Sequence, residues 1–262
     1  MYEIQTYLGA DGLMHCTVCK EPVEAFYPKG SLLEMRKHHR QCACKRKAYA
    51  EEAQYYKEKE HRELIARNKK ICFEEKEMEG FTFQNVERDS GVIRIAEEYV
   101  TNWQKMKQNH MGYLFWGPVG TGKSYLAACI ANALLEKEVT VKMTNFNTIL
   151  NDLFAAEDKT EYIRLLNGYE LLIIDDLGVE RSSEYALENI FSVIDWRYRS
   201  GKPLIITTNL PLAQLKQETK IEKKRIYDRI LERCIPVKID GVSRREAMAN
   251  DNMQTMKNIL KI

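Results

Sequence analysis

Residues 112–124 read GYLFWGPVGTGKS, an apolar run that leads directly into a glycine-rich segment. A helix-like stretch, KSYLAACIANALLEKE, overlaps its end and continues the chain. The glycine-rich part matches the phosphate-binding pattern G-x-x-x-x-G-K-[ST] in full, with a strand before it and a helix after it as the pattern requires. Its members are Gly117, Pro118, Val119, Gly120, Thr121, Gly122, Lys123 and Ser124.

This segment predicts a site for nucleotide phosphates. Its glycines let backbone N–H groups close around phosphate oxygens, and the amino terminus of the following helix adds free donors and a favourable dipole. We expect Lys123 to contact the outer phosphates of ATP and Ser124 to place its hydroxyl on Mg²⁺. The competing interpretation, a glycine-rich turn without a ligand, does not explain why strand and helix flank it.

Strand-like and helix-like stretches alternate from Gly80 to the end of the sequence. This alternation predicts an α/β domain with a parallel sheet flanked by helices. A last short strand precedes a terminal helix. The predicted strands are GYLFW, VTVKMT, LLIID, PLIITTN and IPVKI.

Two adjacent aspartates end the most apolar of these strands, in LLIIDDLG at residues 171–178. Four large aliphatic residues in a row are typical of a strand covered on both faces, and ligands bind at the carboxyl ends of parallel strands. We therefore predict that Asp175 is the second Mg²⁺ contact and that Asp176 orients or deprotonates the attacking water. A solvated acidic turn is the alternative interpretation.

A third polar strand end follows PLIITT, where Asn209 succeeds Thr207 and Thr208. An asparagine there could hold the attacking water or contact the γ-phosphate of ATP. It could equally cap the next segment.

The amino-terminal stretch carries four of the seven cysteines in two close pairs. Cys16 with Cys19, and Cys42 with Cys44, supply four thiolates, enough for a closed tetrahedral Zn²⁺ site. His38 and His39 lie near enough in sequence to replace one cysteine. Free structural cysteines are the alternative, and Cys72, Cys129 and Cys234 are isolated enough to be packing residues.

Composition divides the chain into three parts. Residues 1–48 form the cysteine-rich module, 49–79 a charged helical linker that contains no glycine or proline, and 80–262 the α/β domain. The 262 residues are 44% hydrophobic and 30% charged, with a net charge of +2, as in an ordinary globular protein. Because we find no long apolar run and no signal-peptide pattern, we expect a cytoplasmic protein. The basic segment RKHHRQCACKRK could bind nucleic acid or an acidic protein surface, or be solvated.

The order of these motifs resembles the AAA+ ATPases. A phosphate-binding loop, LLIIDDLG, IITTNL, the basic stretch RIYDRILERC and a late S-x-R in GVSRREA follow one another. Within that class the sequence is similar to the DnaC/IstB family of bacterial and phage helicase loaders and transposition ATPases. The resemblance covers residues 80–262, and it departs from most AAA+ proteins in having Asp-Asp instead of Asp-Glu and room for a lid of only one helix or so.

The resemblance implies roles for three further residues. Asn209 corresponds to the sensor-1 residue, Arg229 to the arginine finger given to a neighbouring subunit, and Arg245 to the sensor-2 residue. Arg225 and Arg233 lie on nearby turns of the same predicted helix, so they compete with Arg229 for the finger role. A surface salt bridge is the other interpretation of these arginines.

The resemblance implies an ATPase that loads a DnaB-type replicative helicase onto single-stranded DNA, and the shorter side chain of Asp176 predicts slow hydrolysis. It implies self-association through the AAA+ domains and partner binding by the zinc module. An ATPase that assists a transposase, in the manner of IstB, is the alternative client. A P-loop kinase for a small molecule and an adaptor that binds ATP without hydrolysing it are less consistent with the complete set of motifs.

Overall fold

The computed structural model describes residues 5–33, 36–85, 91–178, 183–241 and 243–260. The chain divides into two compact units, Met1–Leu64 and Ile65–Ile262. The boundary between them falls inside one helix, α1 (Ala43–Cys72). Each unit is described separately below.

The first unit is built from two small antiparallel hairpins and the start of α1. Strand β1 (Thr6–Leu8) pairs with β2 (Met14–Cys16), and β3 (Glu24–Phe26) pairs with β4 (Lys37–His39). Among its described residues, the buried hydrophobic cluster consists of Cys16, Val23 and Cys42. Small units with so little apolar burial are commonly stabilised by disulfides or by a structural metal.

Helix α1 begins and ends before the bounds of the predicted linker helix at residues 49–79. At its start, the Glu21 carboxylate accepts a hydrogen bond of 2.6 Å from the Ala43 amide, which satisfies a free donor of the first turn. At its end, Cys72 and Phe73 are buried in the second unit, and the short 3₁₀ helix η1 (Lys76–Gly80) follows. A residue distant in sequence therefore contacts the start of the helix, and its end lies in the core of the second unit.

The second unit contains a parallel sheet of five strands in the order β6-β7-β8-β5-β9. The predicted parallel α/β architecture is therefore confirmed. Strand β8 lies between β5 and β7, so the segments that follow these three strands meet at one edge of the sheet. The strands are β5 (Gly112–Trp116), β6 (Val141–Asn145), β7 (Leu171–Leu177), β8 (Leu204–Thr208) and β9 (Cys234–Lys238).

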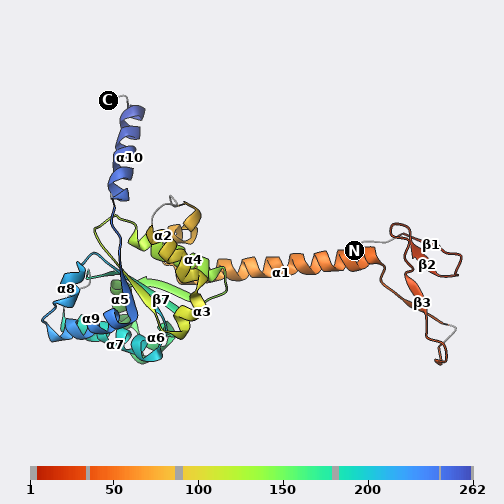
Figure 1. The fold of residues 1–262 in the computed structure, drawn as a ribbon, viewed down its shortest axis with the longest axis horizontal. Helices are drawn as coiled ribbons and strands as arrows, with labels where there is room; N and C mark the ends of the chain where they lie inside the picture. Colours follow the sequence, from red (N-terminus) through yellow and green to blue (C-terminus); the bar gives the residue numbers. More distant parts are fainter. Residues whose placement is uncertain (1–4, 34–35, 86–90, 179–182, 242, 261–262) are drawn as a thin grey trace. The chain divides into compact units, whose positions relative to one another are not determined.

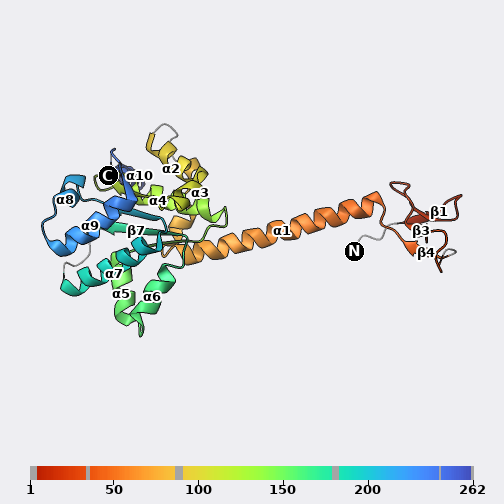
Figure 2. The same cartoon turned by 60° about the horizontal axis from the view of Figure 1, so that its bottom comes forward.

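Helices cover both faces of this sheet (Figures 1 and 2). One apolar core joins the sheet to the end of α1 and to α2, α3 and α4, and a second joins it to α5, α6, α7, α8 and α9. Side chains of β7 alternate between the two cores, with Ile173 in the first and Ile174 in the second. The helices are α2 (Gly91–Thr101), α3 (Trp103–Gln108), α4 (Lys123–Leu135), α5 (Phe146–Ala155), α6 (Lys159–Leu166), α7 (Glu184–Ser200), α8 (Leu212–Lys216) and α9 (Ile221–Arg233).

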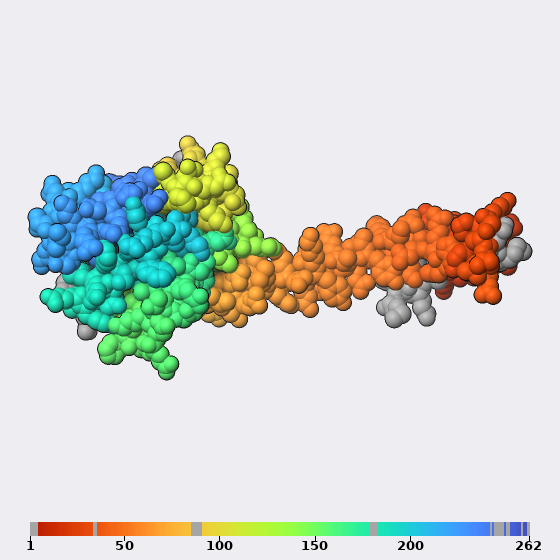
Figure 3. All heavy atoms as spheres, turned by 90° about the horizontal axis from the view of Figure 1, so that it is seen from below, coloured from red at the N-terminus to blue at the C-terminus, as the bar shows by residue number. Residues whose placement is uncertain are grey.

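The structure adds elements that the sequence analysis did not identify. Helices α2, α3 and α6 are new, as is the short 3₁₀ helix η2 (Phe83–Asn85). After the last strand, the described residues form one helix, α10 (Arg244–Leu260). This agrees with the prediction of a lid reduced to about one helix. Helices α5, α7 and α9 form neighbouring bands on the surface of the second unit in Figure 3.

Candidate nucleotide site and cysteine cluster

The phosphate-binding loop follows β5 and has a backbone that requires glycine. Gly117, Gly120 and Gly122 have φ angles of 146°, 80° and 94°. A Cβ on Gly117 would lie 2.2 Å from the carbonyl oxygen of Ile239, and one on Gly120 would lie 2.2 Å from Ser243 Oγ. Gly122 caps α4 without a side-chain hydrogen bond, and the amino terminus of a helix is a favourable place for an anion. The loop therefore fits a phosphate group.

Lys123 lies inside this loop and is only 4% exposed. Its ammonium donates hydrogen bonds of 3.1 Å to the Gly117 carbonyl and 2.6 Å to the Pro118 carbonyl. Thr121 Oγ1 also donates to the Pro118 carbonyl, at 3.0 Å. The loop thus holds a positive charge at its centre, where the outer phosphates of a nucleotide would need it.

Asp175, at the end of β7, lies beside the loop. It is hydrogen-bonded to Ser124 and accepts a hydrogen bond of 2.5 Å from Thr207 Oγ1. Burial raises the pKa of this carboxyl, and the charge of Asp176 adds to the effect, while the Thr207 and Ser124 hydrogen bonds and the Lys123 charge oppose it. The predicted Mg²⁺ contacts, Ser124 and Asp175, are therefore together.

Asp176 lies within an irregular stretch of the β7–β8 pairing, between Ile174 and Leu177, and has a φ of 57°, which is rare for a residue other than glycine. Its amide donates a hydrogen bond of 2.9 Å to Thr207 Oγ1, and Asn209 Nδ2 donates to its Oδ1 at 3.4 Å. The three polar strand ends therefore converge, with Asn209 placed against the second carboxylate.

Thr207 is a residue of this candidate site to which the sequence analysis gave no role. Its fully buried hydroxyl donates to Asp175 and accepts from the Asp176 amide, so one side chain holds both acidic residues. The available signal was its polar side chain at the end of an apolar strand. That signal does not say which neighbouring strand the hydroxyl contacts.

Arg229 lies on α9 and makes its polar contacts within its own chain. Its Nε donates to Asp195 Oδ1 at 2.7 Å, and its Nη1 donates to the Arg225 carbonyl at 3.2 Å. Within the described residues no contact joins Arg229 to the phosphate-binding loop of the same chain. Arg245 lies in α10, but its side chain is outside the described part of the structure.

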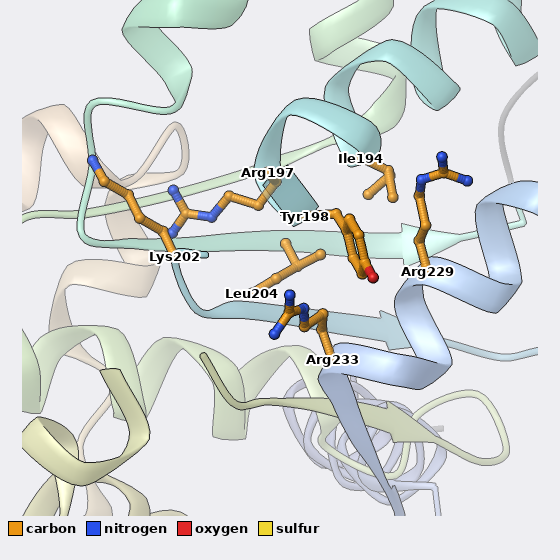
Figure 4. Close-up of a pocket in the computed structure, with 7 residues that line it drawn as sticks. All are labelled: Ile194, Arg197, Tyr198, Lys202, Leu204, Arg229 and Arg233. Atoms are coloured by element: carbon orange, nitrogen blue, oxygen red, sulfur yellow. The ribbon is translucent and has the colours of Figure 1, made fainter. Parts of the chain in front are cut away.

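A pocket opens beside Arg229, between α7, α9 and the start of β8 (Figure 4). Arg197 at its base is buried and donates to the Pro203, Tyr169 and Glu170 carbonyls. Burial lowers the pKa of Arg197 to about 9. These carbonyls give it a structural role in joining the beginnings of the strands. The pocket is lined by Ile194, Arg197, Tyr198, Lys202, Leu204, Arg229 and Arg233.

The four paired cysteines of the first unit form one cluster. The Sγ atoms of Cys16, Cys19, Cys42 and Cys44 all lie within 4.8 Å of one another. Hydrogen bonds from the Cys44 and Glu21 amides lower the pKa of Cys19 to about 6, whereas hydrogen bonding to Cys19 raises the pKa of Cys44 to about 11 and burial raises that of Cys42. Four clustered sulfur atoms are a donor set that fits Zn²⁺.

The histidines offered as alternative ligands lie outside this cluster. His38 Nδ1 is 3.2 Å from the His39 carbonyl oxygen, and its ring is 5.0 Å from that of Tyr27. The cysteines outside it, Cys72, Cys129 and Cys234, are all buried, as expected for packing residues. Among the described residues, no helix has the length and apolar character needed to cross a membrane.

Comparison with known proteins places this chain in a family. The family described as IstB-like ATP binding protein matches residues 48–251. The replicative helicase loader DnaC of Escherichia coli (strain K12) is 29% identical over 149 residues, which cover 55% of this chain and 58% of that protein. The replicative helicase loader DnaI of Bacillus subtilis (strain 168) is 23% identical over 257 residues, covering 88% of this chain and 78% of that protein.

Solved structures show the same fold. The crystal structure of DnaI matches with a TM-score of 0.58 and 25% identity, covering 68% of this chain and 99% of that one. The crystal structure of the DnaC helicase loader matches with a TM-score of 0.53 and 21% identity, covering 63% and 100%. The chain spans only 58% of the length of the DnaC relatives it matches, and more of DnaI.

Proposed function

Because this chain belongs to the family of IstB-like ATP binding proteins, we propose that it is an ATP-dependent loader of a DnaB-type replicative helicase onto single-stranded DNA. The observation that carries the proposal is the similarity to the helicase loader DnaI, which extends over 88% of the chain and beyond the ATPase unit. An ATPase that assists a transposase is the alternative, because the matching family is named after IstB. With these partners, the protein would act in the cytoplasm.

ATP would bind with its phosphates in the loop at residues 117–124. The amides of the loop and of the start of α4 would hold the phosphate oxygens, and Lys123 would turn from the loop carbonyls to the outer phosphates. Ser124 and Asp175 would hold Mg²⁺. That ion, when bound, neutralises charge that develops on the β- and γ-phosphates.

Hydrolysis would be the attack of water on the γ-phosphorus, giving ADP and phosphate. Asp176 would orient this water or accept its proton, and Asn209, which already contacts Asp176, would hold the water against the γ-phosphate. Arg229 of a neighbouring copy and Arg245 would stabilise the charge of the transition state. Self-association through the ATPase units follows from a finger that acts in trans.

The cysteine module would bind Zn²⁺ and the helicase. A closed four-thiolate site holds a structural metal, and the first unit has almost no other core. The basic residues around the second cysteine pair suit either the helicase or DNA phosphates. Metal binding would then be a condition for partner binding and not for catalysis.

The proposal is tested by recovering the partners of the tagged full chain from its host in the presence of ATP. The parent is compared with Cys16→Ser/Cys19→Ser and with Cys129→Ala, which changes a buried cysteine outside the cluster. We expect the replicative helicase to be retained by the parent and by Cys129→Ala and lost from the double variant. Recovery of a transposase in its place would support the alternative, and recovery of neither would contradict both.

A second measurement addresses the ATPase. Lys123→Ala should abolish Mg²⁺-dependent ATP hydrolysis by the purified chain, with or without helicase and single-stranded DNA. Hydrolysis at the parent rate by this variant would show that the assigned site is wrong.

A further inference from the structure

Asp195 of α7 is a buried carboxylate that the proposed reaction does not use. The residue is 8% exposed, and its ion pair with Arg229 joins α7 to α9. Two arginines bind it. Arg229 Nε and Nη2 each lie 2.7 Å from Oδ1, and Arg199 Nε lies 2.8 Å from Oδ2.

The contacts of Arg229 use some of the N–H donors of its guanidinium and leave others unused. A guanidinium has five N–H groups, one on Nε and two on each terminal nitrogen. Asp195 takes the edge formed by Nε and Nη2, and the Arg225 carbonyl takes one N–H of Nη1. One N–H on each terminal nitrogen is not used by these contacts, so two donors remain for phosphate oxygens.

Aromatic rings complete the support of this side chain. The guanidinium carbon of Arg229 is 4.6 Å from the centre of the Phe191 ring and 5.7 Å from that of Tyr198. Figure 4 shows Arg229 and Arg233 coming from α9 on the two sides of Tyr198. The guanidinium is thus restrained by a carboxylate, a carbonyl and two rings, although the side chain is still 24% exposed.

The two competing arginines lack such a restraint. Arg225 lies over the Phe191 ring at 4.3 Å and Arg233 over the Tyr198 ring at 4.7 Å. In the described part of the chain no carboxylate forms an ion pair with either of them, and the Arg233 Nε is buried without a hydrogen-bond partner. Of these three arginines of α9, Arg229 is therefore the one that Asp195 holds in place.

We propose that Asp195 is a positioning residue that holds the Arg229 guanidinium ready for the γ-phosphate bound by a neighbouring copy. The inference rests on the proposed role of Arg229 as an arginine finger. A flexible arginine would lose conformational freedom on reaching the phosphate, whereas one already held by Asp195 loses little. Asp195 contacts the Nε and Nη2 atoms of the guanidinium. The contact therefore positions Arg229 and leaves N–H donors for the phosphate.

The first test measures ATP hydrolysis by Asp195→Asn in the full chain, with Mg²⁺, the replicative helicase and a single-stranded oligonucleotide. The variant keeps the volume but loses the charge that holds Arg229. We expect kcat to fall on the order of 10- to 100-fold, as for a misplaced catalytic group, while KM for ATP changes little. Arg199→Ala is the matched control, since it removes the other partner of Asp195, and should keep the parent kcat within about twofold.

The second test separates positioning in trans from local damage. Asp195→Asn is mixed with Lys123→Ala, so that intact fingers of one variant meet intact phosphate loops of the other. We expect the mixture to hydrolyse ATP faster than the sum of the two variants alone. The mixture of Arg229→Ala with Lys123→Ala should behave in the same way and tests the finger itself.

The outcomes distinguish failure of the positioning role of Asp195 from failure of the finger assignment of Arg229. Rescue with Arg229→Ala but not with Asp195→Asn would leave the proposed function standing and overturn the positioning role. A parent-like kcat for Asp195→Asn alone would also overturn it. Rescue in neither mixture would remove the finger assignment, and the positioning role with it.

Discussion

Thr207 joins the two acidic residues of the site through one hydroxyl, so its loss should affect catalysis more than nucleotide binding. We predict that Thr207→Val lowers kcat for ATP hydrolysis on the order of 10-fold, because Asp175 and Asp176 lose their common partner. The free energy of unfolding should fall by about 1–3 kcal/mol, since the Asp176 amide is left without this acceptor. Equilibrium denaturation and steady-state kinetics measure the two effects.

Controls for this prediction come from the same residue type. Thr207→Ser keeps the hydroxyl and should restore most of the parent kcat. Thr144→Val, on β6, removes a buried hydroxyl that donates to Glu74 and should reduce stability without lowering kcat. Equal losses of kcat in Thr207→Val and Thr144→Val would contradict the assignment.

Because the pKa of Asp175 is raised, we predict that its ionised carboxylate lowers the free energy of unfolding in a pH-dependent way. Burial raises this pKa in the folded chain, so the folded state holds the proton more tightly than the unfolded chain does. The ionised form therefore destabilises the fold above the folded-state pKa, and the penalty disappears below the ordinary carboxyl pKa. Asp175→Asn removes the charge and keeps an oxygen for Thr207.

We expect Asp175→Asn to unfold with a higher free energy than the parent at pH 7, measured without nucleotide and Mg²⁺. The difference should shrink as the pH falls into the ordinary carboxyl range, and the variant should hydrolyse ATP poorly at every pH. A parent that is the more stable of the two at neutral pH would show that the Lys123 charge and the hydrogen bonds outweigh burial.

At the scale of elements, the spacing between β5 and β8 sets the geometry of the site. Gly112 begins β5, and a Cβ added there would lie 1.6 Å from the Leu204 carbonyl oxygen of the neighbouring strand. We predict that Gly112→Ala lowers the free energy of unfolding by about 3 kcal/mol, because backbone and not a flexible side chain must move. Activity should fall as well, since β8 carries Thr207.

The control for this prediction is Gly80→Ala, at the end of η1, where an added Cβ meets no atom within 4 Å. This variant should unfold within about 0.5 kcal/mol of the parent. Similar losses in both variants would mean that the close approach of β5 and β8 does not explain the first.

At the scale of the whole molecule, the chain should separate a metal-dependent unit from a nucleotide-dependent one. We predict that the purified chain carries about one Zn²⁺ and that Cys42→Ser loses it together with helicase binding. ATP binding should remain, since the phosphate-binding loop belongs to the other unit. Elemental analysis, helicase retention and nucleotide titration measure the three properties. A metal-free variant that still binds helicase would contradict the assigned role of the cluster.

Much of the molecule could be predicted from local sequence. The phosphate-binding loop, the buried strand that ends in Asp175 and Asp176, and the two cysteine pairs are each encoded by a few neighbouring residues. The alternation of strands and helices also predicted the parallel sheet. Such features depend on residue types at short fixed spacings, so they are visible before folding.

Only the tertiary structure decided which distant groups meet. The bounds of α1 depend on Glu21 at one end and on burial of Cys72 and Phe73 at the other. The roles of Thr207 and Asp195 depend on side chains 32 and 34 positions away in sequence. Hydrogen bonds and ion pairs act over about 3 Å of space whatever the separation along the chain. A pattern in the sequence therefore specifies the parts of the site, and packing of the strands and helices specifies how those parts touch.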